Sequence, residues 1–253
     1  MSTSLFDINN KAILISGASR GIGRAIALYL AENGAQVYAA GSRPESIEWM
    51  RSHELHAQGR LHPVVMDVRA DDSAATLIEE IRSKHNRLDC LINNAGVATN
   101  TPATGIKADD MENMININFK GAFRACQAYY RAQRKEGGNV INMASILGLI
   151  GTPLAAVYCG TKGAVIQMTR ALAIEWAGSG FRVNAIAPGF VDTDMTDMIK
   201  KRQSVLEKML ETIPMRRMAN PEDLCGATHY LASDASAYVT GQVIVVDGGA
   251  TAM

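Results

Sequence analysis

Residues 12–23 read AILISGASRGIG, an apolar run followed by glycines in the spacing G-x-x-x-G-x-G. The apolar run predicts a buried β-strand at residues 12–16, and the pattern at residues 21–33, closed by Gly34, predicts a helix. Glycines at such a turn allow the backbone to approach a ligand closely, and the helix N-terminus offers unpaired N–H groups and a positive dipole end. We therefore expect a dinucleotide pyrophosphate at this turn, although the spacing departs from G-x-G-x-x-G.

Short apolar runs and longer helical patterns alternate along the rest of the chain. The expected strands lie at residues 36–40, 61–66, 88–93, 139–143, 181–187 and 242–246. The expected helices lie at residues 44–53, 71–85, 108–134, 155–177 and 221–231. This alternation predicts an α/β fold of the Rossmann type, a doubly wound parallel sheet of about seven strands with helices on both faces.

The sequence has no internal repeat and no linker, so we expect a single domain over residues 1–253. Its cofactor half would span about residues 11–145, and its catalytic and substrate-lid part about residues 145–253. The irregular stretch at residues 189–217 follows the end of a predicted strand, which favours a lid over a ligand site.

Composition narrows the classes of function. Lys plus Arg and Asp plus Glu both number 25, so the net charge is zero and binding to nucleic acid or a membrane surface by bulk charge is disfavoured. The four cysteines and five histidines form no metal-ligand spacing, and we expect no metal site. The N-terminal residues lack the pattern of a signal peptide, and no run of about 18 apolar residues occurs. We expect a cytoplasmic protein with reduced cysteines.

The end of the second expected strand bears on the choice between NAD and NADP. A carboxylate there would bind the ribose 2′-OH and repel a 2′-phosphate, but residues 39–43 read AAGSR and contain no acid. Arg43 and Ser42 can bind a phosphate, and Arg20 in the glycine loop is a second cation close by. We expect NADP(H), the alternative being that both arginines are ordinary surface residues.

Tyr158 and Lys162 are four residues apart on an expected helix and so lie on one face of it. An ammonium group nearby would lower the phenol pKa from about 10 toward neutrality. Tyr158 would then be able to pass a proton to or from a substrate oxygen. The pair alone could equally be a chance pair on a solvated helix.

With these motifs the chain resembles the short-chain dehydrogenase/reductases over nearly its whole length. The resemblance rests on residues 16–23, Asp67-Val68, N-N-A-G at 93–96, Asn118, Ser145, Tyr158, Lys162, A-P-G at 187–189, Thr193 and D-G-G at 247–249. Ser16 stands where the family often has threonine, and it keeps the hydroxyl group. The resemblance implies an NADP(H)-dependent oxidoreductase acting on a ketone or secondary alcohol.

By this resemblance the catalytic residues would be Asn118, Ser145, Tyr158 and Lys162. Ser145 would polarise the substrate carbonyl, and Tyr158 would donate or accept the proton. Lys162 would lower the phenol pKa and hold the nicotinamide ribose. Asn118 would anchor a water molecule that relays protons to Lys162, the alternative being a local polar role inside its helix.

The resemblance also implies a set of cofactor-binding residues. These are Gly17, Ser19, Arg20, Gly21, Ile22, Gly23, Ser42, Arg43, Asp67, Val68, Asn94, Ala95, Gly96, Tyr158, Lys162, Pro188, Gly189, Val191 and Thr193. Asp67 would contact the adenine amino group, and Asn93 and Ala95 would lie along the cofactor. Thr193 would bind the nicotinamide or pyrophosphate end. Asn94 has a structural alternative, which is to tie neighbouring strands together.

The substrate is less defined by the sequence. Residues 146–157 read ILGLIGTPLAAV and would either line an apolar pocket or belong to the core. Besides a small ketone, we consider the substrates of 3-oxoacyl-carrier-protein reductases and of polyol or sugar-acid dehydrogenases, and a non-enzymatic NADP-sensing scaffold. A carrier protein would need basic surface, for which Arg131, Arg134 and Lys135 are candidates. The resemblance also implies a homo-oligomer, a dimer or a tetramer, in which the long apolar helices pack against the same helices of another subunit, and the last strand and the tail after Gly249 would add a second interface.

Overall fold

The computed structural model describes residues 4–252, apart from the side chains of residues 198 and 199. Their centre is one parallel sheet with the strand order β3-β2-β1-β4-β5-β6-β7, which confirms the predicted doubly wound α/β fold. The strands are β1 (Ala12–Ile15), β2 (Gln36–Gly41), β3 (Leu61–Val65), β4 (Cys90–Asn93), β5 (Gly138–Met143), β6 (Phe181–Pro188) and β7 (Val243–Val246). The strand order reverses between β1 and β4, which is where such sheets bind ligands beyond their carboxyl ends.

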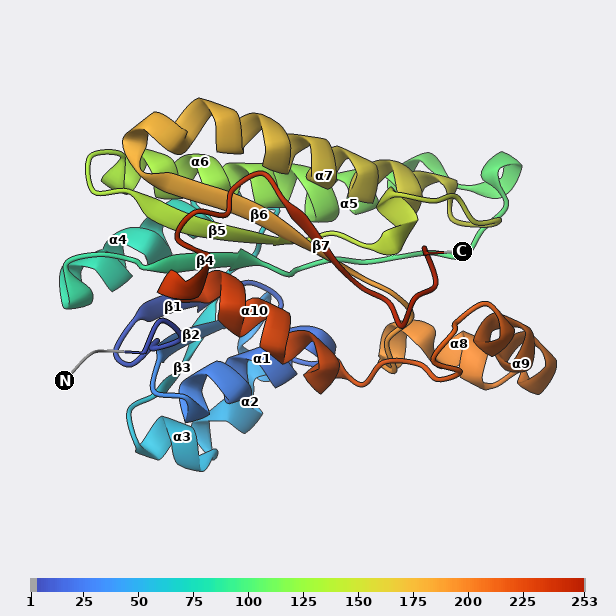
Figure 1. Cartoon of the computed structure of the whole chain (residues 1–253), viewed down its shortest axis with the longest axis horizontal. Helices are drawn as coiled ribbons and strands as arrows, with labels where there is room; N and C mark the ends of the chain where they lie inside the picture. The colour runs from blue at the N-terminus through green and yellow to red at the C-terminus, as the bar shows by residue number, and fades with distance from the viewer. Residues whose placement is uncertain (1–3, 253) are drawn as a thin grey trace.

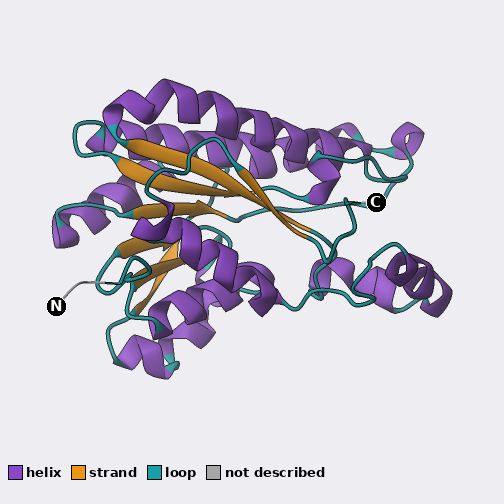
Figure 2. Ribbon diagram, in the orientation of Figure 1, coloured by secondary structure: helices purple, strands orange, loops and turns teal. Residues whose placement is uncertain are grey.

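Helices cover both faces of this sheet (Figures 1 and 2). One face carries α4 (Ser73–His85), α5 (Ala108–Ile115), α6 (Ala122–Gln133) and α7 (Ala156–Trp176). The other carries α1 (Gly21–Glu32), α2 (Pro44–Arg51) and α10 (Cys225–Ala232), with the short α3 (Glu54–Ala57) beside them. Each face encloses its own cluster of buried apolar side chains, because every buried strand sends alternate residues to opposite faces.

The helix expected at residues 108–134 is continuous but not uniform. Between α5 and α6 the backbone widens into a π-helical turn at Asn116–Gly121. Two close contacts lie at this turn: Asn118 accepts a hydrogen bond from the Val97 N–H in the segment after β4, and a Cβ atom on Gly121 would lie 2.8 Å from Cβ of Val68. Such turns often occur at functional sites.

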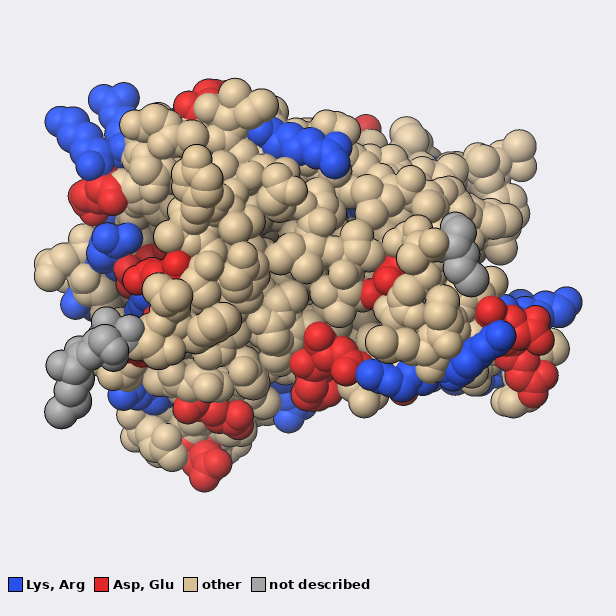
Figure 3. All heavy atoms as spheres, in the orientation of Figure 1, with Lys and Arg blue, Asp and Glu red and all other residues tan. Residues whose placement is uncertain are grey.

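The expected lid at residues 189–217 contains two short helices, α8 (Asp197–Lys200) and α9 (Gln203–Glu211). They lie apart from the sheet, beyond the end of β6 (Figure 1). Acidic and basic side chains lie next to each other over these helices in Figure 3, and Lys200 pairs with both Asp192 and Asp197. On this face the charges are mixed, in keeping with the net charge of zero.

Among residues 4–252, no helix has the length and apolar character needed to cross a membrane. No group of His, Cys, Asp or Glu side chains in the same residues is arranged to hold a metal ion.

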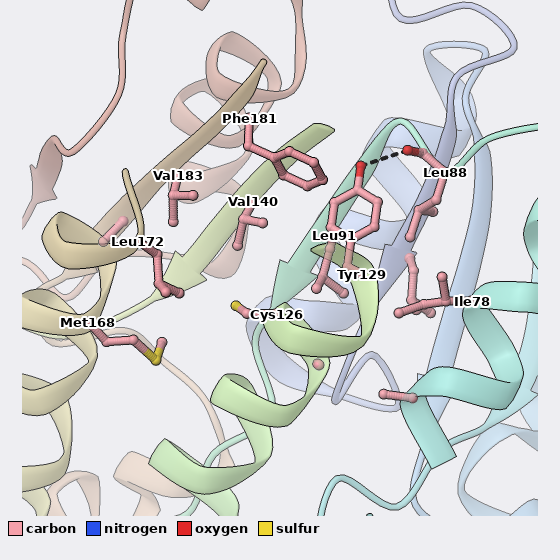
Figure 4. Packing of buried hydrophobic residues seen from close by; sticks show 14 of the residues in the cluster. Ile78, Leu88, Leu91, Cys126, Tyr129, Val140, Met168, Leu172, Phe181 and Val183 are labelled. Atoms are coloured by element: carbon pink, nitrogen blue, oxygen red, sulfur yellow. Dashed lines mark hydrogen bonds between the residues drawn. The ribbon is translucent and has the colours of Figure 1, made fainter. Parts of the chain in front are cut away.

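Tyr129 connects three elements inside the α4–α7 side of the core (Figure 4). Its fully buried ring packs edge-on against Phe181 of β6 at 5.3 Å, and its hydroxyl donates to the carbonyl oxygen of Leu88 at 2.6 Å. The Gln133 amide donates to the same carbonyl at 2.9 Å. The Tyr129 hydroxyl and the Gln133 amide thus satisfy the buried carbonyl oxygen of Leu88, just before β4.

We expect Tyr129→Phe to lower the free energy of unfolding by about 1–2 kcal/mol, because the Leu88 carbonyl loses its shorter hydrogen bond inside the core. Urea unfolding followed by circular dichroism measures this. Tyr238→Phe, at a fully exposed site, is the matched control and should change stability by less than about 0.5 kcal/mol. Equal effects of the two changes would contradict a stabilising role for the Tyr129 hydroxyl.

Candidate active site

The glycine loop after β1 is tied to the end of β4. The Ser16 hydroxyl oxygen accepts from the backbone N–H groups of Asn94 and Ala95, both at 3.0 Å. The Asn94 side-chain amide donates back to the carbonyl oxygens of Ser16 and Gly17 at 3.1 and 2.9 Å. Both amide hydrogens of Asn94 are therefore used. These bonds correspond to the alternative in which Asn94 ties neighbouring strands together.

Glycine is required at two positions of this loop. A Cβ atom on Gly23 would lie 2.4 Å from Nδ2 of Asn94, and one on Gly17 would lie 2.7 Å from Cα of Ala95. Gly17 and Gly21 also have positive φ angles of 64° and 54°. The loop can close this tightly against β4 only without side chains.

The N-terminus of α1 fits the pyrophosphate expected there. Arg20 occupies the N-cap position without a side-chain cap, and no acidic residue stands in the first turn. The first backbone N–H groups of the helix are therefore available to an anion, which the helix dipole also favours. Ile22 packs against the core beneath, and the Ser19 carbonyl accepts from Trp49 Nε1 at 3.0 Å.

The candidate 2′-phosphate residues lie close to this loop. Ser42 and Arg43 follow β2 and are exposed, and a Cβ atom on Gly41 would lie 3.6 Å from Cβ of Ser19. Arg20 is engaged elsewhere, because its guanidinium donates to Asp194 in the lid segment at 2.9 Å. Sequence reasoning missed Asp194, since no local pattern marks it as a partner of Arg20.

The candidate adenine residues follow β3. The Arg69 guanidinium forms an ion pair with Asp67, with 2.7 Å between Nη2 and Oδ2. This pairing holds the pKa of the Asp67 carboxyl below its usual range. The Arg69 backbone N–H also donates to the same carboxylate at 3.0 Å. Val68 packs against Gly121 of the π-helical turn. If Asp67 contacted the adenine, its carboxylate oxygens would have to bind both the adenine and Arg69.

Asn93 corrects one expectation. Its side chain does not face the cofactor side but is buried in the core, where Nδ2 donates to Oδ1 of Asn142 at 2.9 Å and to Sγ of Cys126 at 3.2 Å. Adjacent residues on an extended chain point in opposite directions, so Asn94 and Asn93 cannot both face the loop.

Ser145 and Lys162 meet at the end of β5. The Lys162 ammonium group, on the buried side of α7, donates to the carbonyl oxygen of Met143 at 2.7 Å. Ser145 follows two residues later, and its hydroxyl oxygen accepts from the backbone N–H of Leu147 at 3.1 Å. In that bond the serine oxygen is the acceptor, and its O–H is the donor toward Tyr158.

Tyr158 stands one helical turn before Lys162, with the lysine nitrogen 5.8 Å from the centre of the phenol ring. Burial raises the pKa of Tyr158 to about 12, and a hydrogen bond with Ser145 only partly opposes this. The expected lowering of the phenol pKa by Lys162 is therefore wrong for the protein alone. The physical reason is that burial disfavours the phenolate more than the neighbouring groups favour it, while the Lys162 ammonium group is directed at the Met143 carbonyl.

Asn118, in the π-helical turn, connects the segment after β4 to α7 next to Lys162. Its Oδ1 accepts from the Val97 N–H at 2.8 Å, and its Nδ2 donates to the Val97 carbonyl at 2.9 Å and to Oγ1 of Thr161 at 3.1 Å. A Cβ atom on Gly96 would lie 3.5 Å from both Oδ1 of Asn118 and Nζ of Lys162, so the three residues converge. Both amide hydrogens of Asn118 are used, and a proton relay through this residue stays a prediction.

The segment after β6 completes the site. Pro188 ends the strand, and a Cβ atom on Gly189 would lie 2.8 Å from Cα of Asp247, so the chain passes close to the C-terminal turn. Val191 is buried, while the Thr193 hydroxyl caps the short helix Asp194–Thr196 and its methyl group lies 3.3 Å from the Cβ position of Gly21. Thr193 is thus beside the glycine loop, as a residue contacting the pyrophosphate end would be.

Comparison with known proteins agrees with this arrangement. A family model described as enoyl-(acyl carrier protein) reductase matches residues 17–251. A short-chain type dehydrogenase/reductase from Mycobacterium marinum shares 33% identity and superposes with a TM-score of 0.91, over 98% of both chains. The chain belongs to the short-chain dehydrogenase/reductase family. As a member of this family it is an oxidoreductase.

Among relatives of this family, the chain is similar to 3-oxoacyl-[acyl-carrier-protein] reductase FabG of Thermotoga maritima, with 37% identity over 96% of this chain and 98% of the relative. It is 38% identical to oxidoreductase UcpA of Escherichia coli, over 96% and 95% of the two chains. A gluconate 5-dehydrogenase from Burkholderia cenocepacia, solved with NADP and tartrate, shares 30% identity with a TM-score of 0.93 over 98% of both chains.

The buried ammonium group of Lys162 has a measurable cost. Burial lowers its pKa from 10.5 to about 8, which corresponds to about 3 kcal/mol against folding wherever the lysine is charged in both states. We expect Lys162→Met without added cofactor to be more stable than wild type by about 1–3 kcal/mol at pH 6–7, allowing for the lost bond to Met143. This gain should shrink between pH 8 and pH 10, because native Lys162 then releases the proton that the unfolded chain still holds.

Denaturant unfolding at several pH values measures this difference. Lys208→Met, on the exposed side of α9, is the matched control and should show no comparable trend. A Lys162→Met protein that is less stable than wild type at pH 6 would show that the lysine contributes more to the fold than its burial costs.

Proposed function

We propose that this oxidoreductase transfers hydride reversibly between NADP(H) and a ketone or secondary alcohol, with Tyr158 as the proton donor and acceptor. The observation that carries the proposal is the convergence of Ser145, Tyr158 and Lys162 beside a glycine loop with an uncapped helix N-terminus. The nicotinamide supplies the hydride when it is bound, and the protein supplies geometry and protons.

In this proposal each side chain has a role set by its contacts. The O–H of Ser145 donates to the substrate carbonyl and polarises it. With its pKa raised to about 12, Tyr158 holds its proton at neutral pH and is in the form needed to protonate the alkoxide formed by reduction. Lys162 holds the ribose and, with the positive charge of oxidised nicotinamide, favours the phenolate in the oxidative direction.

We expect Tyr158→Phe to lower kcat for ketone reduction by about 10²–10⁴-fold, since the general acid is removed, and to leave the Kd of NADPH nearly unchanged. Stopped-flow absorbance of NADPH and fluorescence titration measure the two quantities. Tyr238→Phe serves as the control with full activity. Wild-type turnover by Tyr158→Phe would refute the assigned role.

We propose NADP(H) rather than NAD(H) as the cofactor. Ser42 and Arg43 are exposed next to the glycine loop, and no acid occupies the end of β2. Because Arg20 pairs with Asp194, Arg43 is the cation most available to a 2′-phosphate.

Arg43→Ala should raise the KM of NADPH about tenfold and change that of NADH by less than about twofold, because only NADPH carries the phosphate. Initial rates with both cofactors measure this. Arg51→Ala, an exposed arginine of the same helix region paired with Glu48, is the control. Equal changes for both cofactors would contradict the phosphate contact.

A 3-oxoacyl thioester is a second candidate substrate class, favoured by the similarity to FabG of Thermotoga maritima over nearly the whole of both chains. The similarity to gluconate 5-dehydrogenase of Burkholderia cenocepacia keeps sugar acids as a third. Initial-rate oxidation of NADPH across ketones, sugar-derived keto acids and a 3-oxoacyl thioester separates these classes.

We also propose that the chain acts as one domain, with a cofactor half at about residues 11–145 and a catalytic and lid part at about residues 145–253, around its single seven-stranded sheet. A homo-oligomer, dimer or tetramer, is supported by exposed apolar side chains such as Ile174 on α7 and Val245 on β7, and light scattering tests it. We propose a location in the reducing cytoplasm, which is supported by four free cysteines, Cys90, Cys126, Cys159 and Cys225.

A further inference from the structure

Trp49 of α2 is hydrogen-bonded to the glycine loop. Its indole N–H donates to the Ser19 carbonyl oxygen at 3.0 Å, although the two residues are 30 positions apart in the sequence. The ring is half-buried and packs against the apolar cluster between the sheet and helices α1, α2 and α10. Neither the glycine motif nor the proton-transfer residues explain why a tryptophan stands at this position.

Two further contacts hold the indole ring in one orientation. The Arg24 guanidinium of α1 lies 4.0 Å from the centre of the ring, within the range of a cation–π contact. His53, which follows α2, packs edge-on against the ring with 6.2 Å between the ring centres. The N–H donor is therefore directed at Ser19 before any ligand binds.

The hydrogen bond fixes the direction of the peptide group between Ser19 and Arg20. A trans peptide group points its carbonyl oxygen and its N–H in opposite directions, and the described residues contain no cis peptide bond. The indole lies over Arg24, one helical turn after Arg20, and so beside the body of α1. The Ser19 carbonyl points toward the indole, and the Arg20 N–H therefore points toward the open N-terminal end of the helix.

The Arg20 N–H is available to a ligand. Within residues 4–252 it donates to no backbone or side-chain acceptor, whereas the Arg20 side chain is paired with Asp194. The peptide group also lies next to the end of β2, because Cβ of Ser19 is 3.6 Å from the Cβ position of Gly41. This is the end of the strand at which we place the 2′-phosphate of the cofactor.

We propose that Trp49 is a positioning residue for cofactor binding, an inference that rests on the proposed use of NADP(H). By holding the Ser19 carbonyl, its indole N–H directs the Arg20 N–H at an oxygen of the 2′-phosphate. The phosphate then has a backbone donor in addition to the Arg43 side chain. Because this donor is oriented in advance, less conformational entropy is lost when the cofactor binds.

Trp49→Phe tests this role, since it keeps an aromatic ring and removes the N–H donor. We expect the Kd of NADPH and of adenosine 2′,5′-bisphosphate to rise about three- to tenfold, the effect of one lost hydrogen bond. The Kd of NADH and kcat at saturating NADPH should change by less than about twofold, because neither depends on the 2′-phosphate contact. Calorimetric titration measures the Kd values, and initial rates give kcat.

Ser52→Ala is the matched control. The Ser52 hydroxyl donates to the Trp49 carbonyl at 3.0 Å, so this change removes a hydrogen bond at Trp49 and keeps the indole N–H. It should leave every Kd within about twofold of wild type. A Trp49→Phe protein with a lower Tm and an unchanged NADPH Kd would show a purely structural role and overturn the proposal. Equal weakening of NADPH and NADH would overturn the assignment to the 2′-phosphate.

Binding without turnover separates failure of this inference from failure of the proposed function. Adenosine 2′,5′-bisphosphate carries the 2′-phosphate and no nicotinamide, so its Kd does not depend on hydride transfer. Should wild type bind NADPH and reduce no carbonyl compound, the proposed hydride transfer fails, and the Kd comparison still decides the role of Trp49. A bisphosphate Kd that Arg43→Ala raises and Trp49→Phe leaves unchanged would refute the role of Trp49 alone.

Discussion

The tie between Ser16 and Asn94 is the constraint on which the rest of the site depends. Four hydrogen bonds between these residues and their neighbours Gly17 and Ala95 join the ends of β1 and β4 where the strand order reverses. Because the bonds are partly buried, they hold the glycine loop in one conformation before any ligand binds. The uncapped N-terminus of α1 is thereby positioned as an anion site beside the first residues after β4.

A second set of polar contacts positions the start of α7, with Tyr158 and Lys162, relative to that loop. Asn118 reaches from the π-helical turn to the Val97 backbone and to Thr161 on α7, next to Lys162. This geometry places a lysine ammonium group inside the protein, where it donates to the Met143 carbonyl and lies 5.8 Å from the centre of the Tyr158 ring. Burial thus shifts both groups toward their neutral forms, raising the pKa of Tyr158 to about 12 and lowering that of Lys162 to about 8.

The lid segment is connected to both halves of the site. Arg20 of the glycine loop pairs with Asp194, and the C-terminal turn packs against the lid where Met215 N–H donates to the Gly248 carbonyl at 3.1 Å. Asp247 stabilises that turn by accepting from the N–H groups of Gly249 and Thr251 at 2.9 and 2.8 Å. The glycine loop, the lid segment and the C-terminal turn are therefore connected to one another.

The sequence by itself determined the seven parallel strands, the helices between them, the glycine loop and the common helix face of Tyr158 and Lys162. These features follow from local periodicity and from the rule that carboxyl ends of parallel strands share one edge of the sheet. The direction of Asn93, the pairing of Arg20 with Asp194, the π-helical turn and the high pKa of Tyr158 were decided only by the tertiary structure. Each depends on burial or on contacts between distant residues, and a linear pattern contains neither.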